Sequence, residues 1–220
     1  MSWNTIIFDL DGTLLNSLED IRDSANYTMR KMGFSEKDRE EIKGAVGNGV
    51  RHLLTSCIPQ EQKADEEILE QALQIFRQYY FLHSQDKTFP YEGACGHLER
   101  LDERGLKMAV ISNKPDEAAQ KVVRHFFGDH ITYISGEKDG VRRKPAPDLI
   151  KEALHFFGSD AVCAVYVGDS EVDVLTARNA GIPVILVSWG FRSREALEAL
   201  EPDYLVDNFD ELTTLILEQM

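Results

Sequence analysis

The sequence predicts an α/β fold, in which a Rossmann-like parallel sheet carries an inserted domain made only of helices. Three observations support this prediction. An apolar segment at residues 5–8 is typical of a buried strand, residues 17–84 show helical patterns only, and short apolar strands alternate with helices after residue 87. The strand pattern is therefore interrupted once, and it resumes after the helices. We expect an α/β core and a helical cap domain, formed respectively by residues 1–15 with 85–220 and by residues 16–84.

The first strand, T-I-I-F at residues 5–8, is followed directly by acidic residues. Asp9 and Asp11 lie two positions apart, and Gly12 comes next. Residues i and i+2 of an extended strand point to the same side, so the two carboxylates are expected to be neighbours. Such carboxylates repel each other unless a cation lies between them or the two acids have different functions. Gly12 allows the chain to turn away at once toward the cap.

The helical segment contains four predicted helices. The first begins at Ser17, where Asp20 completes a pattern similar to a capping box, and it ends at Gly33. In the last helix, apolar residues fall on one side, which indicates packing between helices rather than a cofactor site. This stripe consists of Ile68, Ala72, Ile75, Phe76 and Tyr79. The remaining predicted helices cover residues 35–43, ended by Gly44, residues 50–57 and residues 65–82.

The second half of the chain alternates strands with helices. Its strands are short and almost continuously apolar, which is typical of a parallel sheet covered on both faces. Sites in such sheets form at the carboxyl ends of the strands. The predicted strands cover residues 106–112, 131–135, 161–169, 183–188 and 204–206, and the predicted helices cover residues 115–127, 146–157, 171–181, 194–200 and the C-terminal segment.

Composition restricts the possible partners and compartments. The formal net charge of −14 over 220 residues argues against nonspecific binding to nucleic acid or to an anionic membrane. Cys57, Cys95 and Cys163 show no metal-binding or redox spacing, so we expect a reduced, cytoplasmic protein. No apolar stretch approaches the roughly 20 residues that a membrane-spanning helix needs. The pattern leaves open whether the protein is a monomer or a homodimer.

Polar residues suited to phosphate chemistry stand at the strand ends. Taken singly, each has a simpler explanation: Asp11-Gly12 as a turn, Ser112-Asn113 as a helix cap, Lys144 as a solvated surface lysine, and Asp169 as part of an exposed helix face. Four such groups at the ends of parallel strands are instead expected to meet at one edge of the sheet. The groups are Asp9 with Asp11, Ser112-Asn113-Lys114, Lys144, and Asp169 with Asp173.

These segments resemble the four motifs of the haloacid dehalogenase superfamily. The matching stretches are D-L-D-G-T at 9–13, S-N-K at 112–114, R-K-P-A-P at 143–147 and G-D-S-E-V-D at 168–173. The resemblance covers essentially the whole chain, including the inserted cap. Within the superfamily the chain is most similar to the phosphoglycolate phosphatase group, through G-N-G at 47–49, S-N-K-P, the stretch from Gly168 to Ile185, and V-S-W-G-F at 187–191.

The resemblance implies roles for the acidic residues and the lysine. Asp9 would attack phosphorus and form an aspartyl-phosphate, and Asp11 would protonate the leaving group and then activate water. Lys144 would bridge the nucleophile and the phosphate, while Ser112 and the backbone near Asn113 would hold other phosphate oxygens.

The resemblance also implies Mg²⁺ as the cofactor. Its expected ligands are the Asp9 carboxylate, the Asp11 backbone carbonyl and Asp169, with Asp173 supporting the site from behind or through water. A cation at this place would answer the repulsion between the acids.

The predicted function is a Mg²⁺-dependent phosphatase that acts on a small phosphorylated metabolite, with 2-phosphoglycolate as the first candidate. An acid at position 11 argues against dehalogenation, because haloacid dehalogenases of the superfamily lack it. A mutase similar to beta-phosphoglucomutase, a pyrophosphatase or nucleotidase, and a non-catalytic binding protein remain as alternatives. In the cap, Asn48 and Arg51 are candidates for binding the substrate, although this segment is equally typical of a helix connection with a surface charge.

Overall fold

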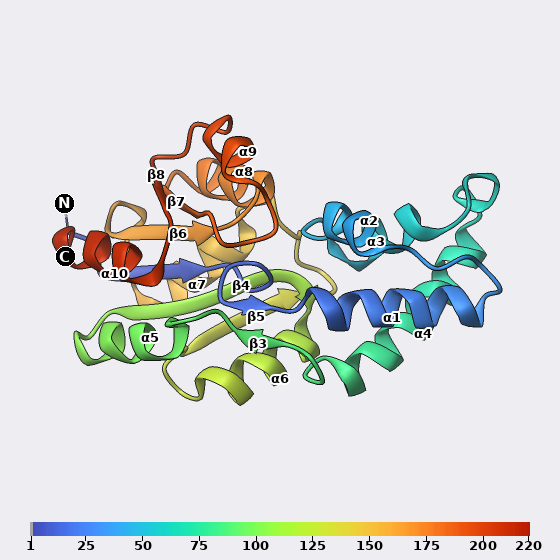
Figure 1. Cartoon of the computed structure of the whole chain (residues 1–220). Helices are drawn as coiled ribbons and strands as arrows, with labels where there is room; N and C mark the ends of the chain where they lie inside the picture. Colours follow the sequence, from blue (N-terminus) through green and yellow to red (C-terminus); the bar gives the residue numbers. More distant parts are fainter. Residues whose placement is uncertain (1) are drawn as a thin grey trace.

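A six-stranded parallel sheet forms the centre of the α/β core (Figure 1). The computed structural model describes residues 2–220. The strand order is β5-β4-β1-β6-β7-β8, and every neighbouring pair is parallel. This confirms the predicted fold class. The strands of the sheet are β1 (Thr5–Phe8), β4 (Lys107–Pro115), β5 (Tyr133–Glu137), β6 (Ala164–Gly168), β7 (Val184–Val187) and β8 (Tyr204–Val206).

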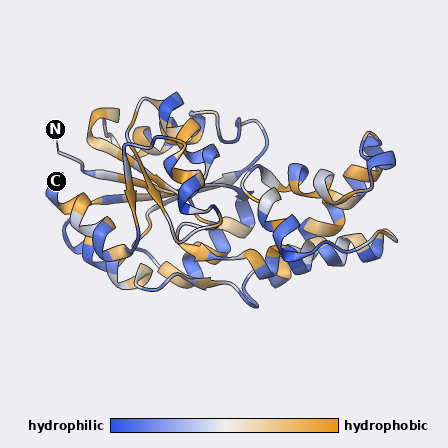
Figure 2. Cartoon of the chain, turned by 45° about the horizontal axis from the view of Figure 1, so that its top comes forward, coloured by the Kyte–Doolittle hydropathy of each residue, from blue (hydrophilic) through white to orange (hydrophobic). Residues whose placement is uncertain are grey.

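Both faces of the sheet are covered by helices, which explains why its strands are apolar throughout. Along β1, Ile6 and Phe8 pack into the hydrophobic cluster on one face, and Ile7 packs into the cluster on the other. Figure 2 shows the hydrophobic colouring gathered along these central strands. Helices α5 (Ala94–Glu103), α6 (Asp116–Phe127) and α10 (Phe209–Glu218) cover the first face, and α7 (Asp148–Phe157), α8 (Glu171–Ala180) and α9 (Arg194–Glu198) cover the second.

The remaining helices form a separate group beyond the carboxyl ends of the strands, opposite to the two termini (Figure 1). They enclose a hydrophobic cluster of their own, which Ala118 of α6 and Phe191 of the core join. The group therefore has its own core and also packs on the α/β core. Its helices are α1 (Leu18–Lys31), α2 (Arg39–Ala45), α3 (Gly49–Cys57), a 3₁₀ turn at Gln60–Gln62 and α4 (Glu66–His83).

The two chain crossings between the core and the helical group lie side by side. Strand β2 (Leu15–Asn16) pairs antiparallel with β3 (Phe89–Pro90). The buried carboxylate of Asp20 accepts hydrogen bonds from the backbone N–H groups of Lys87 and Thr88 and from the Thr88 hydroxyl. This clamp joins the outgoing and returning segments, and we keep residues 16–84 as the proposed cap domain.

Two details of the predicted cap helices are wrong. Ser17 makes no capping bond, because its hydroxyl donates to Asp11 and the partner expected in the cap, Asp20, holds the returning chain instead. The second helix begins later than predicted, since Asp38 and Glu41 form its capping box, and Gly44 lies inside it. In both cases the local pattern fits more than one hydrogen-bond partner, and tertiary contacts decide which one is used.

The apolar stripe of α4 is rotated relative to the prediction. Ala72 and Phe76 are fully buried as expected, but Ile75 and Tyr79 are only partly buried, and Tyr80 is buried in place of Tyr79. Separately, no helix within residues 2–220 is both long and apolar enough to cross a membrane.

Candidate active site

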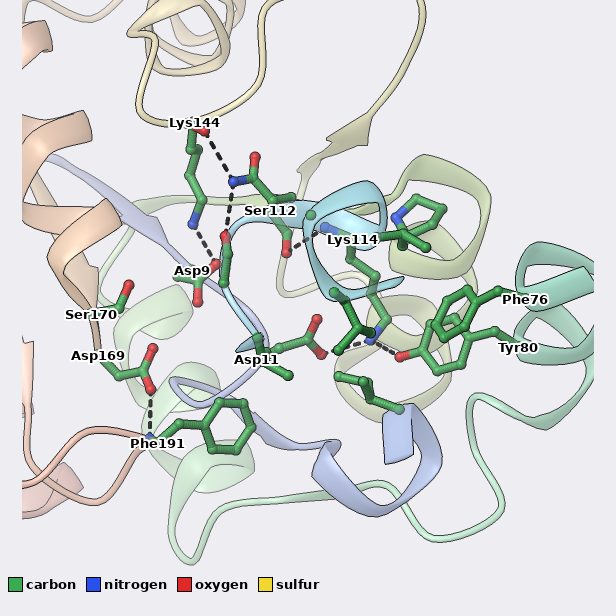
Figure 3. A pocket seen from close by; sticks show the side chains of 18 of the residues that line it. Asp9, Asp11, Phe76, Tyr80, Ser112, Lys114, Lys144, Asp169, Ser170 and Phe191 are labelled. Carbon is green, nitrogen blue, oxygen red and sulfur yellow. Dashed lines mark hydrogen bonds and ion pairs between the residues drawn. The ribbon is translucent and has the colours of Figure 1, made fainter. Parts of the chain in front are cut away.

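The polar residues at the strand ends come together at one edge of the sheet, under the cap (Figure 3). Asp9 follows β1, Ser112 to Lys114 lie at the end of β4, and Asp169 follows β6. They line one cavity together with Lys144 from the loop before α7. The parallel topology therefore gathers all four motifs, as the sequence predicts.

The Lys144 ammonium group links two of the acids. Its Nζ lies 2.6 Å from Asp9 Oδ1 and 2.8 Å from Asp173 Oδ1, and it donates to the Tyr166 hydroxyl at 3.0 Å. The side chains of Lys144, Asp9 and Asp173 are at most 9% exposed. A buried lysine with these three acceptors is fixed in position, which excludes the alternative of a solvated surface lysine.

Asp173 is held by hydrogen bonds at both oxygens. Oδ1 accepts hydrogen bonds from the Lys144 ammonium group and the Tyr166 hydroxyl. Oδ2 accepts hydrogen bonds from the backbone N–H groups of Asp169 and Ser170 and from the Ser170 hydroxyl. So many donors leave little capacity for a further ligand. Asp173 therefore positions Lys144 and the start of α8, which fits the supporting role that the resemblance implies.

Two carboxylate oxygens remain open toward the cavity. Asp9 Oδ1 accepts a hydrogen bond from Lys144, and Asp169 Oδ2 accepts one from the backbone N–H of Phe191 at 2.7 Å. Their other oxygens, Asp9 Oδ2 and Asp169 Oδ1, accept no hydrogen bond from residues 2–220. One ligand atom from each of Asp9, Asp169 and Asp173 lies within 4.8 Å of the others. Hard oxygen ligands with open positions are the donor set that Mg²⁺ prefers, so the residues present fit a divalent cation.

The electrostatics of the acids also favour a bound cation. Burial raises the pKa of Asp9 from 3.8 to about 7, against the opposing effect of Lys144. Burial, with the charges of Asp173 and Asp9, raises the pKa of Asp169 well above its ordinary value. Burial lowers the pKa of Lys144, but the charges of Asp173 and Asp9 raise it by more than burial lowers it. The pKa therefore lies well above its ordinary value, and the lysine is charged. One ammonium group does not compensate three buried carboxylates, and a divalent cation would supply the missing positive charge.

Two glycines allow the chain to approach Asp169 closely. Gly12 has φ of 98°, and a Cβ there would lie 2.2 Å from Asp169 Oδ2. A Cβ on Gly190 would lie 2.4 Å from the same oxygen. The turn predicted at Gly12 is present, and its glycine is also required by contact with a carboxylate 157 positions later, which sequence analysis did not anticipate.

The Asp11 carboxylate does not lie among the other acids. Strand β1 ends at Phe8, so the alternation that predicted neighbouring carboxylates does not extend to Asp11. Its Oδ1 accepts from the Ser17 hydroxyl at 2.5 Å and from the Lys114 ammonium at 2.6 Å. Of the two explanations for the acidic pair, this arrangement favours different functions over a cation held between the two side chains. The two acids have different cationic partners.

Ser112 and Asn113 have different surroundings. The Ser112 hydroxyl oxygen accepts from the backbone N–H of Lys114 at 3.2 Å, and its own hydrogen has no acceptor within the described part of the chain. It can therefore donate to a ligand. The Asn113 amide instead donates to the backbone carbonyls of Gly47 and Lys144. Its side chain joins the cap to the core, and any contact of this residue with phosphate would be through its backbone.

The cap closes the cavity mainly with apolar groups. Arg192 supports this closure, because it pairs with Glu171 and donates to the carbonyls of Lys43 and Val46 in the cap. The cavity volume is about 50 Å³, which suits a small ligand. The cap residues that line the cavity are Ile21, Val46, Gly47, Gly49, Val50, Leu53, Phe76 and Tyr80.

The two cap residues singled out in the sequence lie outside the cavity lining. Arg51 bonds to Glu66 at 2.7 Å and also to Glu70, with its side chain 42% exposed. Asn48 is the residue before α3 and makes no capping bond. The structure brings neither into the site.

Four contacts of the site were not anticipated. The sequence places Tyr166 only in a predicted strand and Phe191 only in the V-S-W-G-F stretch, yet the Tyr166 hydroxyl and the Phe191 backbone hold Lys144 and Asp169. Lys114 was noted within its motif without a role, and Tyr80 was not singled out. A tyrosine in an otherwise aliphatic strand, and a lysine directly after the Ser-Asn pair, are the only signals that pointed to them.

Comparison with known proteins agrees with this geometry. Residues 6–187 match the model of the haloacid dehalogenase-like hydrolase family. The chain is 31% identical to a phosphoglycolate phosphatase of Mesorhizobium japonicum, with 100% of this chain and 97% of the relative covered. It is 30% identical to a phosphoglycolate phosphatase of Aquifex aeolicus, with 96% of this chain and 95% of the relative covered.

A solved structure shows the same fold. The crystal structure of a provisionally assigned phosphoglycolate phosphatase from Lactobacillus delbrueckii subsp. bulgaricus matches with a TM-score of 0.91 and 34% identity, covering 98% of this chain and 99% of the other. The family match spans most of the chain, and the motifs that carry it line one cavity. The chain therefore belongs to the haloacid dehalogenase-like hydrolase family, and it is a phosphatase.

Proposed function

We propose that the protein hydrolyses 2-phosphoglycolate with the help of Mg²⁺, through an aspartyl-phosphate intermediate. The observation that carries this proposal is the environment of Asp9. One of its oxygens is fixed by Lys144, and the other is open beside the open oxygen of Asp169. A carboxylate held in this way has a free nucleophilic atom and a neighbouring place for a cation.

In the proposed reaction the open oxygen of Asp9 attacks phosphorus, and the bond between phosphorus and the leaving oxygen breaks. Asp11 has its own partners, Ser17 and Lys114, and would give a proton to the leaving oxygen. In the second step Asp11 would take a proton from water, which attacks the phosphorus of the intermediate and releases inorganic phosphate together with free Asp9. The separate surroundings of the two acids suit these separate roles.

Charge neutralisation comes from groups that the fold fixes in advance. The Ser112 hydroxyl, whose hydrogen has no acceptor among the described residues, would hold a phosphate oxygen, and the Lys144 ammonium group, which already donates to three acceptors, would stabilise the charge through its field as it moves during transfer. When bound, Mg²⁺ would neutralise phosphate charge and orient the phosphoryl group, held by Asp9, Asp169 and the backbone carbonyl of Asp11, with Asp173 behind them. The cap would exclude bulk water from the cavity.

The substrate assignment depends on the size of the cavity and on the relatives. A cavity volume of about 50 Å³ favours a small substrate over a bulky nucleotide in this arrangement of the cap. The relatives at 31% and 30% identity are named phosphoglycolate phosphatases. A pyrophosphatase named PpaX from Bacillus cereus is 27% identical over 98% of this chain, so pyrophosphate is the second candidate.

The deciding experiment is phosphate release from a panel of 2-phosphoglycolate, pyrophosphate, sugar phosphates and nucleoside monophosphates, each with Mg²⁺ and with EDTA. We expect one strong preference, for 2-phosphoglycolate, and loss of activity with EDTA. A preference for pyrophosphate would replace the substrate assignment. Isomerised sugar phosphate with little free phosphate would indicate a mutase, and silence across the panel in a folded protein would contradict the proposal.

A further inference from the structure

We propose that Lys114 of β4 and Tyr80 of α4 form an anion subsite, which binds the carboxylate of the substrate and selects phosphorylated acids over neutral phosphate esters. This inference rests on the proposed function and deepens it. It assigns a specificity role to two residues, one from the core and one from the cap.

The two residues form a buried cluster at the wall of the cavity, on the opposite side of Asp11 from Lys144 (Figure 3). The Lys114 side chain is 1% exposed, and its Nζ lies 2.6 Å from Asp11 Oδ1. The same ammonium group donates to the Tyr80 hydroxyl and lies 4.8 Å from the centre of the tyrosine ring. The cation is therefore fixed at three points.

Each group keeps one hydrogen that has no acceptor. An ammonium group has three donors, and those of Lys114 reach only Asp11 and Tyr80 among residues 2–220. The Tyr80 oxygen accepts from Lys114, and its hydroxyl hydrogen reaches no acceptor in the same part of the chain. Buried donors normally have partners, so two unused donors at a cavity wall indicate a ligand that accepts hydrogen bonds.

Within residues 2–220, the Lys114 ammonium group is paired with a single carboxylate, that of Asp11, and it keeps one free hydrogen. The other two cations of the cavity wall are already committed. Lys144 is shared by Asp9 and Asp173, and Arg192 is held by Glu171 and by cap carbonyls.

The position of Lys114 matches the leaving group rather than the phosphate. Asp11 is the proposed acid for the leaving oxygen, and Lys114 contacts that acid directly. In 2-phosphoglycolate a single carbon separates the leaving oxygen from the carboxylate, so the carboxylate lies on the Asp11 side of the substrate. The cap surroundings there are otherwise apolar, from Ile21, Val50, Leu53 and Phe76. An unpaired carboxylate among them would be costly, and Lys114 with Tyr80 would compensate it.

The test compares two substrates in the Mg²⁺-loaded enzyme: 2-phosphoglycolate and ethyl phosphate, which has the same carbon chain without the carboxylate. For Lys114→Met we expect the ratio of the two kcat/KM values to fall by about 100-fold, as for the loss of a charged hydrogen bond. Tyr80→Phe keeps the contact between Lys114 and Asp11, and the ratio is expected to fall by about 5-fold to 10-fold. Tyr79→Phe is the matched control, because Tyr79 stacks on Tyr27 and His83 and does not line the cavity.

Binding gives a second readout, which does not depend on Asp11 as an acid. In the Asp9→Asn background, calorimetry should show that Lys114→Met weakens the binding of 2-phosphoglycolate by about 100-fold and the binding of ethyl phosphate by less than about 3-fold. Equal losses for both substrates would show that Lys114 acts only through Asp11, and would overturn the subsite. A preference of the wild-type enzyme for ethyl phosphate would also overturn the subsite, but it would leave the phosphatase assignment unchanged. If the wild type hydrolyses neither ester, the proposed function itself fails. Should Lys114→Met not fold, Tyr80→Phe and Lys114→Arg, which retains the charge, decide the question.

Discussion

Ion pairs in the α/β core and in the cap have the same chemistry but opposite surroundings. Lys144 and Asp9 pair with side chains that are 3% and 9% exposed, whereas Arg51 and Glu66 in the cap are 42% and 69% exposed. A buried pair is expensive to form and very sensitive to the loss of one partner, while an exposed pair contributes little. The buried charge of the core therefore lies at the site, and most charge in the cap is on its surface. The contribution of the cap to the site comes from its apolar lining and from Tyr80.

The largest expected difference is in activity. Asp9→Asn keeps the shape of the side chain but removes the proposed nucleophile, so we expect a loss of about 10⁴-fold or more in kcat. Phosphate release measures the activity, and circular dichroism checks that the variant is folded. Activity within 10-fold of the wild type would contradict the nucleophilic role.

The second difference is in stability. Lys144→Met leaves Asp9 and Asp173 buried without a cation, and we expect the free energy of unfolding to fall by about 3–5 kcal/mol in the metal-free protein. The matched control is Lys138→Met, because Lys138 pairs with Glu152 at side-chain exposures of 39% and 41%. The control should cost less than about 1 kcal/mol. Similar losses in urea unfolding of the two variants would remove the distinction between buried and exposed pairs.

Metal binding should depend on pH because protons compete for the same carboxylates. The pKa of Asp9 is raised from 3.8 to about 7 in the folded, metal-free protein. Between these two pH values the folded protein therefore binds a proton at Asp9 that the unfolded chain does not bind. The stability contributed by this proton is lost as the pH rises from about 4 to about 7. Saturating Mg²⁺ should therefore raise the melting temperature more at pH 8 than at pH 5. Asp9→Asn should reduce that difference. An equal shift at both pH values in wild type would argue against binding to these acids.

Replacing a glycine by alanine should be harmful at the site and favourable in the cap. Gly12→Ala places a Cβ 2.2 Å from Asp169 Oδ2 at a φ of 98°, and we expect kcat/KM to fall by about 100-fold or more. Gly44→Ala lies in helix α2 with no atom within 4 Å of the added Cβ, and should stabilise the protein by about 0.5–1 kcal/mol. Thermal unfolding and activity assays of both variants measure the contrast. A harmless Gly12→Ala would show that the approach to Asp169 is adjustable.

The smallest effect is expected at Arg51. Because its partners Glu66 and Glu70 are exposed and it does not line the cavity, Arg51→Ala should leave KM for 2-phosphoglycolate unchanged and alter stability by less than about 1 kcal/mol. A clear rise in KM would place Arg51 at the substrate after all, and would require a different arrangement of the cap.

The core was predictable from the sequence to a much greater extent than the cap. Apolar strands that end in Asp9, Ser112 and Asp169 are local patterns, and parallel topology brings their ends together without further information. The side on which the Asp11 carboxylate lies was not predictable, because it depends on where β1 stops and on Lys114 more than 100 positions away. The same holds for Tyr80, whose place beside Lys114 depends on how α4 is rotated in the cap.

The hydrogen bonds that join the core to the cap have one further consequence. Asn113 and Arg192 hold the cap through the backbone carbonyls of Lys43, Val46 and Gly47, and every amino acid has such a carbonyl. At Lys43 and Val46 the side chain can therefore be exchanged without removing these bonds, whereas Gly47, with φ of 114°, is restricted. Over evolutionary time, the lining of the cavity would be free to change and accept new substrates while the machinery beneath it stays the same.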